Sequence, residues 1–404
     1  MKRSLIIPSV VSLAALFAFA PLAACDLTQE LQGAGADGGA GTPPPAALGD
    51  AAPSPVTPTP DGGKADAAAK GPISICVPSA SRGSVKILVD GSENPYMHDV
   101  TDIAFTTSRV FLLSTPFSFI GAPYGGGAVD SYSMTATIPS FMAFAIAPAE
   151  ASVAGSRANQ NLGGTELPGD GGHIFALKGS TSSSSDRPGE VLVDGADVVF
   201  WTHSPAQLVQ GSLSGGAERV IADYPDATKR TITALALDAT DIWFASVLTN
   251  GAFLTGGMLH RVPRAGGAVV DVVSLPEGTA AGGILFDGNS IYMPEGIRGA
   301  GEFMLAYEKS GGTVTYRSLM SKALGSSRVL FDGTFFYWAE SNGADTCNGT
   351  FKRRNKDNSP EETLLTNLDT IFQLRARSGA FYLGSGYHAF RKPATPGQLI
   401  EWKP

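Results

Sequence analysis

One sequence pattern recurs about every 45 residues through most of the chain, and it restricts the fold more than any other feature. Each copy has an apolar triplet, a turn often built on Asp-Gly or Asp-Ala, and a second apolar run with an aromatic residue. A period of this length indicates a protein built from similar supersecondary units. Seven anchor positions mark the turns, spaced 41 to 49 residues apart: Thr106, Ala147, Asp194, Asp238, Asp287, Asp332 and Arg377.

The columns of this repeat have the pattern of β-strands. Positions three before, one before and four after the anchor are apolar in all seven copies. The triplet before the anchor is apolar on nearly every residue, so we expect a first strand that is buried on both faces. Asp-Gly and Asp-Ala turns suit a tight hairpin, because Gly tolerates positive φ and Asp hydrogen-bonds the local backbone. Position five after the anchor is aromatic in five copies: Phe111, Trp243, Tyr292, Tyr337 and Tyr382.

Each period has room for four short strands. In the copy at Asp238, a third run over 258–262 and a fourth over 269–273 flank a Gly-Gly turn. Four antiparallel strands per repeat describe a blade of a β-propeller. We therefore predict an all-β fold, a β-propeller of seven four-stranded blades. The alternative is six blades plus a capping hairpin, because the first two copies lack the Asp. The strand expected over 84–90 would pair with the last blade and close the ring.

The N-terminus has the layout of an export signal. Lys2 and Arg3 precede an uncharged, mostly apolar run that ends at Leu22-Ala23-Ala24-Cys25. This ending resembles the lipobox of bacterial lipoproteins. The resemblance implies cleavage after a signal peptide of residues 1–24 and acylation of Cys25, which would bear the membrane anchor. Several acyl chains make such attachment effectively permanent. An ordinary signal followed by a free buried cysteine is the alternative.

Residues 25–72 are expected to form a tether. They are rich in Ala, Gly and Pro, and no aromatic residue occurs between 31 and 72, so the segment cannot bury enough apolar surface to offset the entropy of ordering. The propeller, with its N-terminal closing segment, is expected over 73–404. The lipobox and runs such as 285–292 together resemble bacterial envelope β-propeller lipoproteins. This resemblance implies a lipid-anchored location in the bacterial cell envelope, on the periplasmic face or the outer-membrane surface.

Charge and cysteine content exclude some classes of protein. The net charge of −8 argues against nucleic-acid binding, which needs a surplus of Lys and Arg. Loss of Lys2 and Arg3 with the signal would change the net charge to −10. The chain has 3 cysteines, too few for a disulfide scaffold. In an oxidising compartment, Cys76 and Cys347 are expected to form a disulfide that joins the N-terminal segment to the sixth blade.

No motif points to catalysis. The sequence has no Gly-x-Ser-x-Gly or His-Glu-x-x-His, and its 5 histidines show no metal-ligand spacing. Turn chemistry accounts for the repeated Asp residues better than a ring of metal ligands does. We therefore expect no catalytic residue, no cofactor and no metal site.

The candidate binding face follows from loop length. Connections between second and third strands vary, the longest running over 155–172, and long variable loops often carry function. Four polar residues lie four positions before an anchor and should ring the central opening on that face, although solvation alone would also account for them: Asp102, Glu190, Arg328 and Gln373.

The sequence thus favours a monomeric, lipid-anchored binding or scaffolding module for a protein or glycan. The alternative is a propeller hydrolase or lyase with a divalent metal in the central opening. Acidic or His side chains that converge in the opening would favour the enzyme, and an apolar opening would favour binding.

The lipobox predicts covalent labelling. Metabolic labelling with a palmitate analogue should mark the wild-type protein and be lost in Cys25→Ser, because that thiol is the acylation site. In-gel fluorescence of the two proteins measures this, and equal labelling of both would contradict the assignment.

Overall fold

A computed structural model describes residues 76–404 apart from short gaps, which are residues 95–96, 98–99, 107, 115–117, 134–143, 147–151, 158–164, 168–171, 179–187, 195–196, 204–205, 213–218, 226–227, 251–252, 295–303, 318–328, 341–346, 358 and 387–396. The expected signal peptide, Cys25 and the tether lie outside the described residues.

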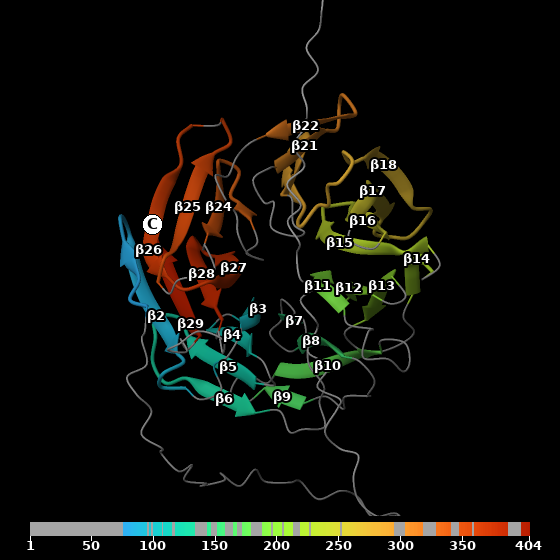
Figure 1. Cartoon of the computed structure of the whole chain (residues 1–404). Coiled ribbons are helices and arrows are strands. Elements are labelled where there is room, and N and C mark those ends of the chain that lie inside the picture. The colour runs from blue at the N-terminus through green and yellow to red at the C-terminus, as the bar shows by residue number, and fades with distance from the viewer. Residues whose placement is uncertain are drawn as a thin grey trace, which may run out of the picture. The chain divides into compact units, whose positions relative to one another are not determined.

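The described part of the chain forms seven β-sheets, or blades (Figure 1). Among the described residues, no helix has the length and apolar character needed to span a membrane. Blade 1 contains β3 (Val100–Phe105), β4 (Arg109–Ser114), β5 (Ser118–Pro123) and β6 (Asp130–Ser133); blade 2 contains β7 (Phe144–Ile146), β8 (Ser152–Arg157), β9 (Thr165–Leu167) and β10 (Gly172–Lys178). Blade 3 contains β11 (Pro188–Asp194), β12 (Asp197–His203), β13 (Ala206–Ser212) and β14 (Arg219–Tyr224); blade 4 contains β15 (Arg230–Leu237), β16 (Asp241–Asn250), β17 (Phe253–Pro263) and β18 (Val270–Ser274); blade 5 contains β19 (Leu285–Asp287), β20 (Ser290–Pro294), β21 (Met304–Glu308) and β22 (Thr313–Arg317). Blade 6 contains β1 (Ser79–Ala80), β23 (Leu330–Phe331), β24 (Phe335–Glu340), β25 (Gly349–Asn355) and β26 (Glu362–Leu368); blade 7 contains β2 (Ser84–Asp90), β27 (Ile371–Arg377), β28 (Ala380–Ser385) and β29 (Gln398–Lys403).

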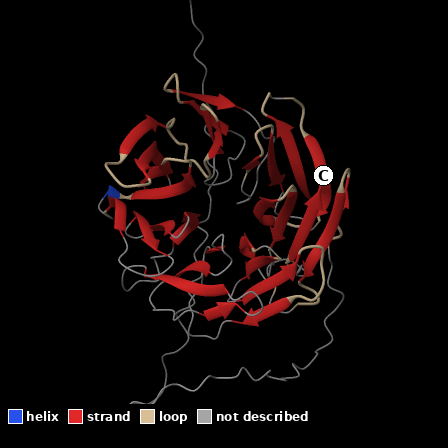
Figure 2. Ribbon diagram, turned by 180° about the vertical axis from the view of Figure 1, so that it is seen from behind, coloured by secondary structure: helices blue, strands red, loops and turns tan. Residues whose placement is uncertain are grey.

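The first strands of successive blades are neighbours. Contacts join β27 to β3, β3 to β7, β7 to β11 and β11 to β15, and they continue from β19 through β23 to β27. Blades 4 and 5 share a core cluster that includes Ala234, Ile284 and Ile291. The sheets therefore follow one another around a centre bordered by their first strands, an arrangement that Figure 2 shows from behind. This is the predicted β-propeller, with seven blades rather than six plus a hairpin.

Blade 2 departs from the regular order. Its strands run β7-β8-β10-β9, with β10 parallel to β8 and antiparallel to β9. The connection expected over 155–172 is therefore not a plain loop, because it contains β9. Apolar runs identify strands here, but they do not specify which strand pairs with which.

Burial within a blade differs from the sequence expectation. The second strand is the more completely buried one, since all residues of β28 and the middle four of β24 are buried, whereas β19 and β23 are only half-buried. Second strands have a neighbouring blade on each face. First strands border the central opening, so the side chains beside it keep some exposure to solvent.

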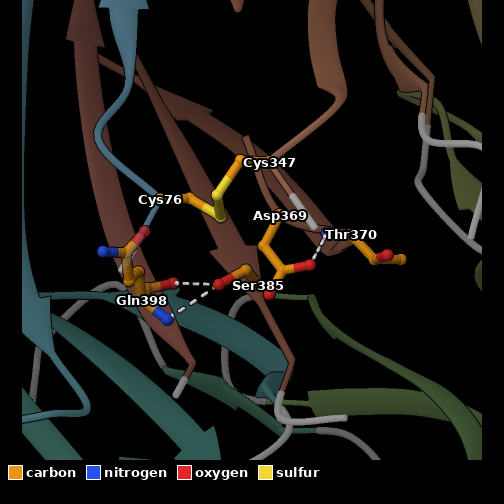
Figure 3. The surroundings of a disulfide bond; sticks show 6 residues. All are labelled: Cys76, Cys347, Asp369, Thr370, Ser385 and Gln398. Carbon is orange, nitrogen blue, oxygen red and sulfur yellow. Dashed lines mark hydrogen bonds between the residues drawn. A yellow bond between two sulfur atoms is a disulfide. The ribbon is translucent and has the colours of Figure 1, made fainter. Parts of the chain in front are cut away.

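The N-terminal segment crosses two blades. The strand expected over 84–90 is β2, which pairs antiparallel with β29 as the outer strand of blade 7. Just before it, β1 pairs with β26 of blade 6, and Ser81 and Arg82 contact the same strand. The expected disulfide between Cys76 and Cys347 is present, with Cα atoms 5.1 Å apart. Figure 3 shows it where the N-terminal segment meets blade 6.

The disulfide predicts a loss of stability on its removal. It links residues 271 positions apart, so the double variant Cys76→Ser/Cys347→Ser should lose about 2–5 kcal/mol of unfolding free energy. Denaturant unfolding of the mature chain without reductant measures this loss.

Cys25→Ser serves as the matched control and should leave the unfolding free energy unchanged. Intact mass after alkylation of the unreduced, denatured wild type should show both Cys76 and Cys347 unmodified, and labelling at these two residues would contradict the bond.

Candidate functional site

The Asp at each clear anchor organises its turn. Asp238 Oδ1 accepts hydrogen bonds from the backbone N–H groups of Thr240 at 2.9 Å and Asp241 at 2.8 Å. Its Oδ2 accepts one from Nε1 of Trp243, the aromatic residue five positions after the anchor, at 2.7 Å. Burial opposes the ionised form, but these donors outweigh it and hold the pKa of Asp238 below its usual value. The carboxylate is therefore occupied by its own blade.

The anchor of blade 6 has the same geometry. Asp332 Oδ1 accepts hydrogen bonds from the N–H groups of Thr334 and Phe335, both at 2.8 Å, and Oδ2 accepts one from the Tyr337 hydroxyl at 2.8 Å. Burial and the neighbouring carboxylate together raise the pKa of Tyr337 to about 12. Among the described residues, no group of three or more His, Cys, Asp or Glu side chains could hold a metal ion. The anchor Asp residues thus serve as turn and packing residues.

Three of the anchor Asp residues also meet a side chain from the next blade. The partner is the residue that follows the third strand of that blade, about 70 positions along the sequence. We call these contacts the inter-blade ion pairs: Asp194 with Arg264 (Nε to Oδ2, 2.8 Å), Asp238 with Lys309 (3.9 Å), and Asp287 with Lys356 (2.7 Å).

Blade 7 replaces the ion pair with a cation–π contact. Its anchor is Arg377, and the guanidinium lies 5.5 Å from the ring centroid of Tyr124, the residue after the third strand of blade 1. The periodicity of the sequence reveals the turns but not these pairs, because the two members belong to different copies of the repeat.

An apolar hollow lies beside the anchor ends of the first strands of blades 3 to 6. Its volume is about 470 Å³, and no His, Asp, Glu, Lys or Arg side chain lines it. Six of the lining residues are half-buried rather than buried, as expected beside an opening. We call this hollow the apolar opening; its lining residues are Leu192, Leu235, Ala236, Leu237, Ile284, Leu285, Phe286 and Phe331.

The candidate binding-face residues lie elsewhere. Asp102 on β3 is only 2% exposed, and it pairs with Arg375 of blade 7 at 2.6 Å. Gln373 on β27 is partly buried. Glu190 falls on β11, but its side chain is not among the described ones, and Arg328 lies outside the described residues. The structure thus brings Asp102 against a neighbouring blade, and the hollow lies toward the other end of the first strands.

A Ser-His-Asp array in blade 4 matches no linear sequence motif, because its members come from three different strands. Ser246 Oγ lies 2.6 Å from His260 Nε2, and His260 Nδ1 lies 2.7 Å from Asp271 Oδ1. With Nδ1 protonated, the imidazole donates to Asp271 and accepts from the Ser246 hydroxyl. The ring of Phe244 stacks on the imidazole, with centroids 4.6 Å apart.

This array resembles a catalytic triad in its distances, but its serine and histidine are not accessible to a substrate. Ser246 is 1% exposed and His260 is 3% exposed, so a substrate carbonyl has no path to the hydroxyl oxygen. Nη1 of Arg230 also donates to Ser246 Oγ at 2.7 Å. Tyr224 of blade 3 reaches the same histidine, with ring centroids 6.0 Å apart. The array therefore joins blades 3 and 4 and does not present a nucleophile.

Comparison with known proteins supports the fold. No family model matches the chain, and no curated protein matches it. Among solved structures, YCF48 from Cyanidioschyzon merolae is similar, with 13% identity and a TM-score of 0.52 over 80% of this chain and 99% of that chain. YCF48 bound to D1 peptide gives 9% identity and a TM-score of 0.51 over 80% and 95% of the two chains.

BamB from Moraxella catarrhalis is also similar, with 12% identity and a TM-score of 0.50 over 81% of this chain and 100% of that chain. These neighbours are β-propellers. At such low identities the likeness shows the fold alone.

The buried histidine predicts a pH-dependent stability. Burial lowers the pKa of His260, although its hydrogen bond to Asp271 opposes the shift. Because the folded pKa lies below the unfolded value of about 6.5, the unfolded state binds more protons as the pH falls. The contribution of His260 to stability is thus complete above about pH 6.5 and lost as the pH falls through the folded pKa.

Unfolding free energies between pH 7.5 and 5 should therefore fall more steeply for the wild type than for His260→Gln, which cannot be protonated there. NMR titration of the labelled imidazoles gives the folded pKa directly. A value for His260 above 6.5 would show that the shift has the opposite sign.

Proposed function

We propose that this protein is a lipid-anchored β-propeller of the bacterial cell envelope that acts as a monomeric binding module for a protein partner, held at the apolar opening. The single observation that carries the proposal is the lining of that opening. Leucine, isoleucine, alanine and phenylalanine side chains from four blades converge on a hollow of about 470 Å³. Concave apolar surface of this kind favours the burial of an apolar group from a partner.

The same lining weighs against the alternative of a hydrolase or lyase with a divalent metal. Hard cations are held by several oxygen ligands, and zinc by histidine, cysteine or carboxylate side chains. The lining of the apolar opening contains none of these residues. A glycan is the other partner that the sequence allows, and the crosslinking experiment below distinguishes it from a protein.

Two further observations support the proposal. One of the similar solved structures is YCF48 bound to a D1 peptide, so a propeller with this likeness can hold a peptide. The lipobox-like Leu22-Ala23-Ala24-Cys25 supports the anchor, and residues 25–72 would give the propeller reach from the membrane.

Site-specific photo-crosslinking tests the partner. The photoreactive residue p-benzoylphenylalanine replaces Leu285 or Phe331 in the lining in cells that express the full chain. Val270, an outer-strand residue that is 43% exposed, serves as the control position. We expect ultraviolet-dependent adducts to one discrete protein segment from the lining positions but not from Val270.

Mass spectrometry identifies the segment that is joined to the lining. Adducts at Val270 alone, or none from either lining position in protein that is exported and folded, would refute binding at the apolar opening. Adducts to polysaccharide would instead support the glycan.

A further inference from the structure

We infer that the segment held in the apolar opening carries a carboxylate next to its apolar side chain, and that Lys309 binds this carboxylate. This inference rests on the proposed function and adds the chemistry of the partner.

Lys309 does not line the apolar opening itself, but it lies against one of the residues that do. It follows β21, and its Nζ is 5.6 Å from the ring centroid of Phe286, which lines the opening. The same ammonium is 5.2 Å from the ring centroid of Trp243 and borders a second, polar hollow. An apolar group that rests against Phe286 therefore brings an attached carboxylate close to Lys309.

The pairing of Lys309 within the chain is the loosest of the inter-blade ion pairs. Its Nζ lies 3.9 Å from Asp238 Oδ2, beyond hydrogen-bond distance. The oxygens of Asp238 already accept from two backbone N–H groups and from the Trp243 indole. By contrast, Lys356 lies 2.7 Å from Asp287. Lys309 therefore has donor capacity toward an acceptor that arrives from solvent.

Positive charge is accessible at this edge, even though each cation has a carboxylate partner and Asp238, Asp241 and Asp271 line the polar hollow that Lys309 borders. In each inter-blade ion pair, the cation is more exposed than its carboxylate. The exposed fractions are 33% for Lys309 against 22% for Asp238, 40% for Lys356 against 25% for Asp287, and 31% for Arg264 against 14% for Asp194. The cation of each pair is therefore more accessible to an incoming carboxylate than its own partner is.

The backbone around the opening favours a polypeptide over a fatty acid with the same two groups. The lining strands β11, β15, β19 and β23 are each terminal in their sheet, so their inward edges carry backbone N–H and C=O groups that pair with no strand of these sheets. A peptide backbone can hydrogen-bond to such groups, whereas a hydrocarbon chain would cover them without replacing the lost water.

Two fluorescent probes test the chemistry of the site. 1-Anilinonaphthalene-8-sulfonate carries an anionic group on an apolar ring system, and N-phenyl-1-naphthylamine has the same rings without the charge. The protein is the full mature chain with Cys25→Ser, studied without detergent. We expect the anionic probe to bind more tightly, and Lys309→Met to weaken it about fivefold or more while leaving the neutral probe unchanged.

Lys403→Met is the matched control, because Lys403 is exposed at the end of β29 in blade 7. It should change neither affinity. Leu285→Asp, which places a carboxylate in the lining, should abolish binding of both probes. Leu192→Asp repeats this test in blade 3 in case the first variant does not fold, and circular dichroism checks the fold of each variant.

The outcomes separate the two proposals. Equal effects of Lys309→Met and Lys403→Met on the anionic probe would overturn the role of Lys309, and loss of both probes in Leu285→Asp would still support the apolar opening. If folded Leu285→Asp and Leu192→Asp both bind the probes as the wild type does, the proposed function falls as well.

The source of the carboxylate is tested by displacement. A synthetic hexapeptide that ends in phenylalanine should displace the anionic probe at a lower concentration as the free acid than as the C-terminal amide, and this difference should vanish in Lys309→Met. Displacement by decanoate but by neither peptide would overturn the assignment to a protein segment.

Discussion

Pairing of β2 with β29 is the interaction on which the other contacts depend, because it completes the outer part of blade 7 with a strand from the opposite end of the chain. Each blade buries its second strand only if a neighbouring blade covers both of its faces. A ring satisfies this requirement for every blade at once, whereas an open row would leave two faces uncovered. The core cluster that joins β2, β3 and β28 includes Leu88, Ile103 and Tyr382, so closure is also a packing interaction.

The inter-blade ion pairs act within this packed ring and do not create it. Half-exposed ion pairs contribute modestly to stability, on the order of 1 kcal/mol or less. Their value lies in geometry, because each fixes the end of a first strand against the following blade. Two of their cations also lie over aromatic rings that line the apolar opening, Lys309 over Phe286 and Lys356 over Phe331, so the packing contacts and the candidate recognition surface share side chains. Lys309 has the weakest contact with its own carboxylate partner, so it contributes least to packing between blades and is the most available for recognition of a partner.

Much of the fold could be predicted from the sequence, because strand periodicity and turn chemistry act locally. The apolar columns located all seven first strands, and the turn residues located the anchors. The order of strands in blade 2 could not be predicted, since parallel pairing of β8 and β10 depends on contacts that no local pattern reports. The array of Ser246, His260 and Asp271 was also missed, because antiparallel register brings together residues that are 11 to 25 positions apart. The candidate face at Asp102 was placed by loop length alone, whereas the hollow depends on which side chains the blades fail to cover.

The disulfide determines how the propeller bears a mechanical load. Any tension that arrives along the chain from the residues before Cys76 reaches the sulfur bridge before it reaches β1 or β2. The bridge passes that tension to Cys347 and so into blade 6, while the hydrogen bonds between β2 and β29 lie beyond it in the chain. A covalent bond thus takes up the tension before it reaches the strand that closes the ring. A pull from the N-terminal side therefore does not separate β2 from β29.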